Sequence, residues 1–318
     1  MPTPLALQGS LALYQTKPYP LPYFETNGHH PNKLVFLAGL TDTIGVVPYL
    51  PRLASALDHI QYALVQPIKG SDLGGFGLSS LEGDAQEIAG LIQHLTTRQQ
   101  NPRTGKLVVM GHSTGCQDVI QLLSQERSLS QNGGNPKIHI DGGILQAPAS
   151  DHDYFEANKT EKEVNLLAES EKLIGANQGS QLLPRDDTAS KPSSIDGRGN
   201  GNADAVLKPA FTAYRYQSLN GANGDDDFFS DKLTDQQIYS ALHPALVRAP
   251  LLMLIGENDE YVPKSIDKIQ QIRRYSTILK DDPLNVMLVP DADHKVNDAG
   301  AQEKVCDAVI YFLGNLKD

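Results

Sequence analysis

Short apolar runs and amphipathic stretches alternate along most of the chain. The apolar runs predict core strands, and the stretches between them carry apolar positions at helical spacing. We predict strands at 34–37, 62–66, 107–110, 142–146, 251–255 and 286–289, and helices at 48–57, 80–97, 117–125, 265–275 and 301–313. This alternation is typical of an α/β fold in which helices cover both faces of a mostly parallel sheet. Residues 11–14 predict an additional antiparallel edge strand.

The alternation stops between residue 149 and about residue 243. A charged helical stretch at 154–173 is followed by the segments 191–201 and 220–229, which are rich in glycine and polar residues. We therefore predict a core formed by residues 1–149 and 244–318, and an insertion at 150–243. An insertion that follows a strand end is expected to cover the site as a cap, and a surface excursion far from the chemistry is the alternative.

Composition is compatible with one soluble globular protein, since 318 residues that are 40% hydrophobic can bury a large core. No stretch approaches the length of a membrane span. A formal charge of -11 argues against a nucleic-acid partner and favours a neutral or cationic small molecule. The start of the chain has no basic leader, so we expect a cytosolic protein.

Nothing in the sequence predicts a metal or a cofactor. Cys116 and Cys306 fall in predicted helices without metal-ligand spacing, and we expect reduced core residues. The segment 196–201 superficially resembles a calcium loop. Its twelfth position, which should be acidic, is Leu207, so calcium binding is not predicted.

The strongest chemical signal is Gly111-His112-Ser113-Thr114-Gly115, which lies between a predicted strand and a predicted helix. Such a Gly-x-Ser-x-Gly turn holds a serine in a strained conformation, and its glycines let the following helix pass close by. The helix N-terminus directs partial positive charge at the serine. The alternative is a chance pattern in a glycine-rich chain. The flanking strand and helix favour Ser113 as a nucleophile.

A nucleophilic serine needs a histidine base and an orienting carboxylate, and in this arrangement they follow in the order Ser, Asp, His. Asp259 lies in the acidic turn after the strand at 251–255, and His294 lies in the loop after the strand at 286–289. We predict these two as the partners of Ser113. Glu257 remains the rival for the carboxylate because it also lies just past the strand.

The reaction also requires donors for the developing oxyanion, and fixed backbone N–H groups suit this role. The amide of Thr114 follows the nucleophile directly. The second donor should come from the turn after the strand at 34–37, where we predict the Leu40 amide. An ordinary glycine turn into a helix is the alternative, and Ala38-Gly39 replaces the His-Gly pair that is frequent in such loops.

The residues Asp225, Asp226 and Asp227 lie in the predicted cap. Three consecutive aspartates are usually a solvated loop. The functional alternative is substrate binding through a negative rim that attracts amine-bearing molecules.

Three separated segments, 69–81, 111–118 and 256–263, together resemble one branch of the α/β-hydrolases that includes fungal intracellular siderophore esterases. The resemblance covers nearly the whole chain. It implies an α/β-hydrolase fold, the triad Ser113, Asp259 and His294, and hydrolysis of the ester bonds of fusarinine-type hydroxamate siderophores, which releases their iron inside the cell.

Three other functions remain open at this point. One is a carboxylesterase or acyltransferase that acts on another small ester, and another is a lipase. The polar predicted cap, rich in Asn, Asp and Gly, counts against a long lipid chain. A non-catalytic ligand-binding protein with the same fold is the third, since fold alone does not determine function.

Overall fold

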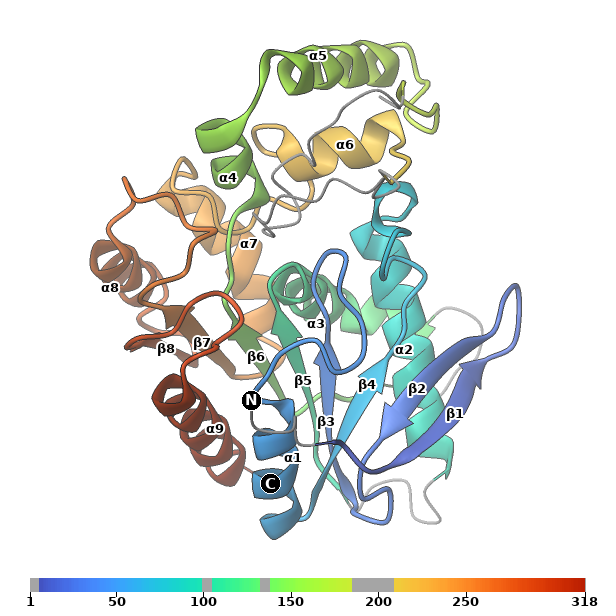
Figure 1. The fold of residues 1–318 in the computed structure, drawn as a ribbon, viewed down its shortest axis with the longest axis vertical. Helices are drawn as coiled ribbons and strands as arrows, with labels where there is room; N and C mark the ends of the chain where they lie inside the picture. Colours follow the sequence, from blue (N-terminus) through green and yellow to red (C-terminus); the bar gives the residue numbers. More distant parts are fainter. Residues whose placement is uncertain (1–5, 99–104, 132–137, 185–208, 318) are drawn as a thin grey trace.

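The computed structural model describes residues 6–98, 105–131, 138–184 and 209–317 (Figure 1). Within these ranges one sheet has the strand order β1-β2-β4-β3-β5-β6-β7-β8. Its strands are β1 Ser10–Gln15, β2 Leu21–Glu25, β3 Asn32–Leu37, β4 Tyr62–Pro67, β5 Leu107–His112, β6 Gly142–Gln146, β7 Leu251–Gly256 and β8 Leu284–Val289. All neighbouring pairs from β4 to β8 in that order are parallel. The predicted α/β class is confirmed.

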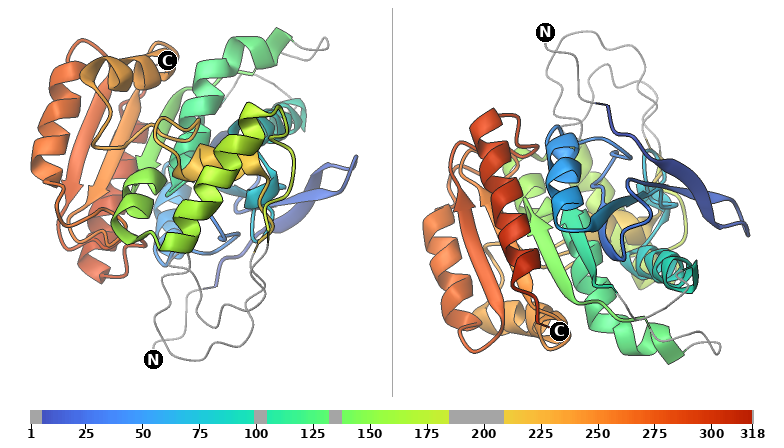
Figure 2. Two further views of the ribbon diagram at one scale, coloured as in Figure 1. Left: turned by 90° about the horizontal axis from the view of Figure 1, so that it is seen from above. Right: turned by 90° about the horizontal axis from the view of Figure 1, so that it is seen from below.

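The inner strands are apolar because both of their faces are covered. Leu34 and Phe36 of β3 point to one core, whereas Val35 and Leu37 point to the other. Helices α1 (Leu50–His59) and α9 (Ala299–Gly314) cover the first face. Helices α2 (Leu81–Arg98), α3 (Gly115–Gln131), α7 (Asp235–Leu246) and α8 (Lys268–Ile278) cover the second. Figure 2 shows these two helical layers from both ends of the molecule.

The antiparallel edge predicted at 11–14 is present as β1, which pairs with β2. β2 was not predicted. It is also antiparallel to β4, so it joins the hairpin to the parallel part of the sheet. Pro20 directly precedes β2 and Pro22 lies within it, and proline has no backbone N–H donor, which weakens the strand signal in the sequence.

The insertion after β6 begins with α4 (Asp151–Asn158), α5 (Glu161–Gly175) and, after a range outside the description, α6 (Ala213–Asn220). The predicted single helical stretch at 154–173 is two helices, because Thr160 begins α5 with a reciprocal capping box to Glu163. A small core of Leu173, Leu183, Ala213 and Tyr216 joins α5 to α6.

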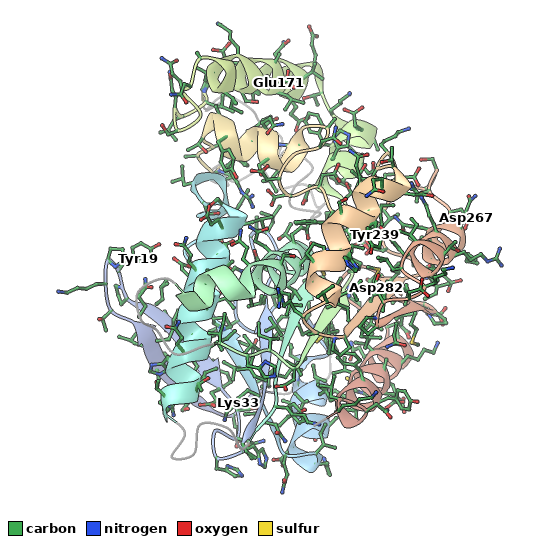
Figure 3. All side chains as sticks on the ribbon, turned by 180° about the vertical axis from the view of Figure 1, so that it is seen from behind. Tyr19, Lys33, Glu171, Tyr239, Asp267 and Asp282 are labelled. Carbon is green, nitrogen blue, oxygen red and sulfur yellow. The ribbon has the colours of Figure 1, made fainter. Side chains whose placement is uncertain are left out.

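The insertion lies beyond the carboxyl ends of the strands. In Figure 3, Glu171 of α5 and Lys33 at the start of β3 occupy opposite ends of the molecule. Helix α7 begins within the predicted insertion 150–243, yet its residues Ile238 and Leu242 pack in the main core beside α3, as Leu246 does. The chain therefore returns to the main core before residue 243. The segment 196–201 and Leu207 lie outside the described residues.

Candidate active site

Ser113 occupies the sharp turn between β5 and α3. Its φ is +56°, a left-handed conformation that is strained for serine. A side chain at Gly111 would collide with the carbonyl oxygen of Gly115, and one at Gly115 would come within 2.5 Å of the Leu37 carbonyl oxygen. Both glycines are therefore required for the turn, and Ser113 is left half-buried at the end of β5.

Asp259 follows β7 and His294 follows β8, and the two buried side chains are paired. His294 Nδ1 lies 3.0 Å and 2.9 Å from the two carboxylate oxygens of Asp259. Glu257 points elsewhere, since its carboxylate accepts a hydrogen bond from the Asp291 amide at 3.1 Å. The structure thus places Asp259, rather than Glu257, beside the histidine.

The loop that carries His294 is held on several sides. The carboxylate of Glu260 accepts a hydrogen bond from the His294 amide at 2.9 Å. The rings of Tyr261 and His112 have centroids 4.4 Å and 4.9 Å from that of His294. His112 directly precedes Ser113, so the histidine ring lies beside the turn. Within the described part of the chain, the Ser113 hydroxyl makes no hydrogen bond, a looseness common in substrate-free sites.

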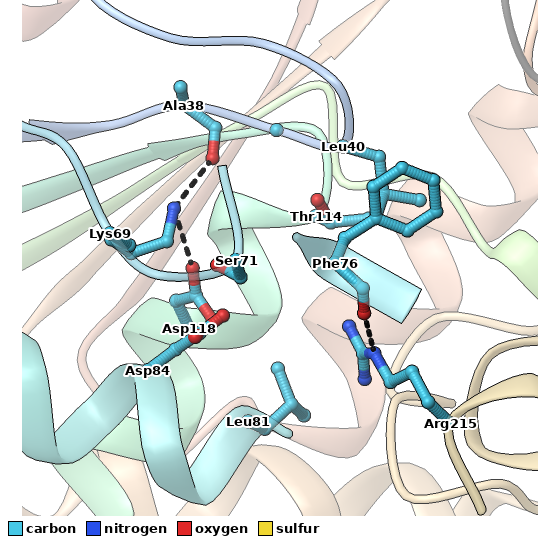
Figure 4. A pocket seen from close by; sticks show the side chains of 11 residues that line it. Ala38, Leu40, Lys69, Ser71, Phe76, Leu81, Asp84, Thr114, Asp118 and Arg215 are labelled. Carbon is cyan, nitrogen blue, oxygen red and sulfur yellow. Dashed lines mark hydrogen bonds and ion pairs between the residues drawn. The ribbon is translucent and has the colours of Figure 1, made fainter. Parts of the chain in front are cut away.

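The two predicted oxyanion donors line one small pocket beside Ser113 (Figure 4). Its free volume of about 10 Å³ has room for about one water molecule. Neither the Leu40 amide nor the Thr114 amide donates a hydrogen bond to any described residue. A side chain at Gly39 would lie 2.7 Å from Ser113 Cβ, so the glycine lets this loop approach the serine.

A buried ionic cluster supports the loop before Leu40. Lys69 Nζ donates to the Ala38 carbonyl at 3.2 Å and to Asp72 at 2.8 Å, and it lies 3.5 Å from Asp118. Burial opposes the charged form of Lys69, but Asp118 and Asp72 together raise its pKa. Burial raises the pKa of Asp84, which also lines the pocket, to about 6. Lys69 therefore fixes the loop that carries one predicted donor.

Gln146, the last residue of β6, connects the turn to the histidine loop. Its main-chain carbonyl accepts a hydrogen bond from the Ser113 amide at 3.0 Å, and its Nε2 donates to the His294 carbonyl at 3.2 Å. Its Oε1 accepts from the Tyr49 hydroxyl at 3.0 Å and lies 2.6 Å from His112 Nδ1. Burial lowers the pKa of His112 well below its usual value, so the ring is neutral and donates through Nδ1.

The three cap aspartates have different surroundings. Asp225 is exposed and accepts a hydrogen bond from the Tyr214 hydroxyl at 2.6 Å. Asp226 is buried and forms an ion pair of 2.5 Å with Arg215. Asp227 is half-buried and accepts from the Ser230 amide at 3.1 Å. Their role in substrate binding stays a prediction, and Asp226 already has a structural partner.

Comparison with known proteins assigns the chain to a family. The family model described as "Protein of unknown function (DUF1749)" matches residues 2–314. The chain belongs to this family. It is 28% identical to "Esterase AN6793" of Emericella nidulans, over 95% of this chain and 89% of that protein. It is 26% identical to "Fusarinine C esterase sidJ" of Aspergillus fumigatus, over 98% of this chain and 96% of that protein. The predicted resemblance is confirmed.

Solved structures agree on the fold. The siderophore hydrolase EstB from Aspergillus fumigatus superposes with a TM-score of 0.76 at 24% identity, over 98% of each chain. A soluble variant of monoglyceride lipase from Saccharomyces cerevisiae gives 0.63 at 12% identity, over 100% of this chain and 99% of that chain. The protein therefore has the α/β-hydrolase fold.

The described residues contain no group of three or more His, Cys, Asp or Glu side chains that could hold a metal ion. In the same ranges, no helix is both long enough and apolar enough to cross a membrane.

Several residues around the site were not predicted from the sequence. Lys69 lies in a glycine-rich segment, and Gln146 is a polar residue that ends an apolar strand. A polar side chain at the carboxyl end of a parallel strand is a usable signal, because ligands bind at that edge of the sheet. This signal does not say which residues the polar side chain will contact, because those contacts depend on the order of the strands in the sheet.

Proposed function

We propose that the protein is a serine esterase whose catalytic triad is Ser113, His294 and Asp259. The observation that carries the proposal is the buried Asp259–His294 pair, with Nδ1 at 2.9 Å and 3.0 Å from the carboxylate oxygens, beside a strained serine at φ +56°. A carboxylate on Nδ1 holds that nitrogen protonated and leaves Nε2 free to act as the base. The unbonded amides of Leu40 and Thr114 support the same assignment.

The reaction has two halves. Ser113 Oγ attacks the ester carbonyl while His294 Nε2 takes its proton, and the negative oxygen of the tetrahedral intermediate accepts hydrogen bonds from the amides of Leu40 and Thr114. His294 then returns the proton to the leaving alcohol, and an acyl-enzyme remains. Water attacks that ester in the same way, which releases the acid and restores Ser113.

For the substrate we propose a fusarinine-type hydroxamate siderophore, whose hydrolysis releases the iron it carries. The names of two relatives, a fusarinine C esterase and a siderophore hydrolase, support this choice. The net charge of -11 suits the free amines of such a compound. Iron is cargo of the substrate in this proposal, and no step requires a metal held by the protein.

The deciding experiment incubates the purified protein with a panel of esters and follows products by mass spectrometry. The panel holds ferric and iron-free fusarinine C, small neutral esters and a long-chain ester. Ser113→Ala is the control. We expect it to lose about 10³-fold or more of the activity while it stays folded, because only binding and the oxyanion donors remain. Near-normal hydrolysis by folded Ser113→Ala would overturn the mechanism.

The same panel separates the alternatives. Turnover of small neutral esters alone would leave a serine esterase and remove the siderophore. Binding of fusarinine C without turnover by the wild-type protein would favour the non-catalytic alternative.

A further inference from the structure

Asp151 lies just after β6, at the same edge of the sheet as the serine turn, and it has no cationic partner among the described residues. It is the first residue of α4, a few residues after Gln146, and it is half-buried. In the ranges that the structure describes, no Lys, Arg or His forms an ion pair with it. The amide Nε2 of Gln117 donates to its carboxylate at 3.4 Å, a long hydrogen bond.

Two buried oxygen atoms, one on Gln117 and one on Asp226, accept no hydrogen bond from the described residues. Gln117 is fully buried and its amide is oriented by Asp151 and by the Ala149 carbonyl at 3.5 Å, yet its Oε1 has no hydrogen-bond partner among described residues. The same holds for Oδ2 of Asp226, whose other oxygen binds Arg215. A buried acceptor without a donor costs about 1–3 kcal/mol. The region therefore has acceptors in excess of donors.

The charges around Asp151 also leave the region in need of a cation. Burial first, and then the negative charge of Asp226, raises the pKa of Asp151 to about 7. Asp227 acts in the same direction, whereas Arg215 and His294 oppose the shift. Arg215 is already engaged by Asp226 at 2.5 Å and by the Phe76 carbonyl at 3.0 Å. A bound cation would favour the ionised form of Asp151.

We propose that Asp151, with Gln117 Oε1 beside it, forms a subsite for a protonated primary amine that the substrate carries close to its scissile ester. This inference rests on the proposed esterase function. An ammonium group offers three N–H donors and a positive charge, which match a carboxylate and a neighbouring unbonded amide oxygen. Position supports it, because Asp151 follows shortly after Gln146, which pairs with His112 in the sheet and donates a hydrogen bond to the His294 carbonyl.

A purely structural role makes a different prediction. A carboxylate at the first position of a helix is favoured by the helix dipole whether or not a ligand binds. Loss of that interaction would change the stability of α4 and would affect all substrates alike. The subsite, in contrast, distinguishes a charged amine from a neutral amide.

The test compares two forms of one substrate, iron-free fusarinine C with free amines and the same compound after chemical N-acetylation. Asp151→Asn keeps an acceptor for Gln117 and removes the charge. We expect kcat/KM for the free-amine form to fall about 10- to 100-fold through KM, the range for a hydrogen bond to a charged group. The acetylated form should change less than about threefold. Asp151→Glu should restore part of the loss.

Glu156→Gln is the matched control, because Glu156 is an exposed carboxylate on the same helix and its one ion pair among the described residues is with Lys159. Glu156→Gln should leave kcat/KM unchanged for the free-amine form and for the acetylated form. Equal losses of Asp151→Asn on both forms, or no loss on either, would refute the subsite and leave the esterase intact. If the wild-type protein does not cleave fusarinine C, the comparison is repeated with ornithine ethyl ester and its N-acetylated form. In that case the lack of fusarinine C cleavage refutes the siderophore as substrate. A preference for the free-amine ornithine ester that Asp151→Asn removes would still support the subsite, and no such preference would refute it.

Discussion

At the scale of single residues, Ser113, Asp259 and His294 could be predicted because each has a local signal. Ser113 has its glycines, and the other two follow apolar strands in a fixed order. Gln146 has only the weaker signal of a polar residue that ends an apolar strand, and Asp151 has no local signal. Their neighbours come from β5, β8 and α3, which only the sheet order brings together.

Asp259 and Glu257 can be separated by matched replacements. Only the carboxylate that touches Nδ1 fixes the tautomer of His294, and that carboxylate is Asp259 at 2.9 Å. We expect Asp259→Asn to lower kcat by about 10³- to 10⁴-fold and Glu257→Gln by less than about tenfold. Steady-state kinetics on one small ester measures both. A reversed ranking would transfer the orienting role to Glu257.

Gln146 makes a second prediction at this scale. Its side chain ties the His294 carbonyl to His112, so Gln146→Leu should let the histidine loop move away from Ser113. We expect kcat to fall about 10- to 100-fold with KM nearly unchanged, since small misplacements of catalytic groups are costly. Gln146→Glu keeps the Oε1 acceptor and loses the donor, and it should be intermediate.

Gln66 is the control for this experiment. It is equally buried in β4, and its Oε1 accepts a hydrogen bond from the Gly45 amide at 2.8 Å without touching the histidine loop. Gln66→Leu should lower thermal stability to a similar degree while kcat falls less. If both variants lose kcat in proportion to stability, Gln146 has only a structural role.

At the scale of elements, the sequence predicts the inner sheet well and the insertion poorly. Apolar runs such as 251–255 coincide with β7 because strands that are buried on both faces must be apolar throughout. The end of the insertion at residue 243 differs from the structure, since α7 belongs to the core. Pro244 lies inside α7 and interrupts the helical signal there.

The attachment of α6 can be tested through Asp226. Its ion pair with Arg215 is buried on both sides, with 3% and 2% exposure, and Arg215 also donates to the Phe76 carbonyl below the cap. Removal of one partner from a buried pair costs about 3–5 kcal/mol. We expect Asp226→Asn to speed hydrogen exchange in α6, whereas Asp225→Asn, at an exposed position, should not.

A triple replacement of Asp225, Asp226 and Asp227 would therefore disturb the cap as well as its charge. The double variant Arg215→Met with Asp226→Leu removes both buried charges and should recover much of the protection. Unchanged exchange in Asp226→Asn would mean that other contacts hold α6 in place.

At the scale of the whole molecule, charge and site act together on the substrate. A net charge of -11 attracts a cationic ester from a distance, in addition to any contact with Asp151. The two effects differ in range. Exposed charges are screened over about 8–10 Å at moderate ionic strength, whereas a half-buried contact is screened much less.

The dependence of the rate on salt should therefore distinguish long-range attraction by the net charge from the local contact with Asp151. We expect kcat/KM for free-amine fusarinine C to fall several-fold as NaCl rises from about 20 mM to about 500 mM, and the value for the acetylated form to stay nearly constant. Asp151→Asn should show a lower rate but nearly the same relative dependence on salt, because it removes one of many charges. Stopped-flow or initial-rate measurements on both forms suffice. A flat salt response in the wild-type protein would show that its net charge plays no part in substrate capture. A response that disappears in Asp151→Asn would mean that the attraction arises locally, at the site itself.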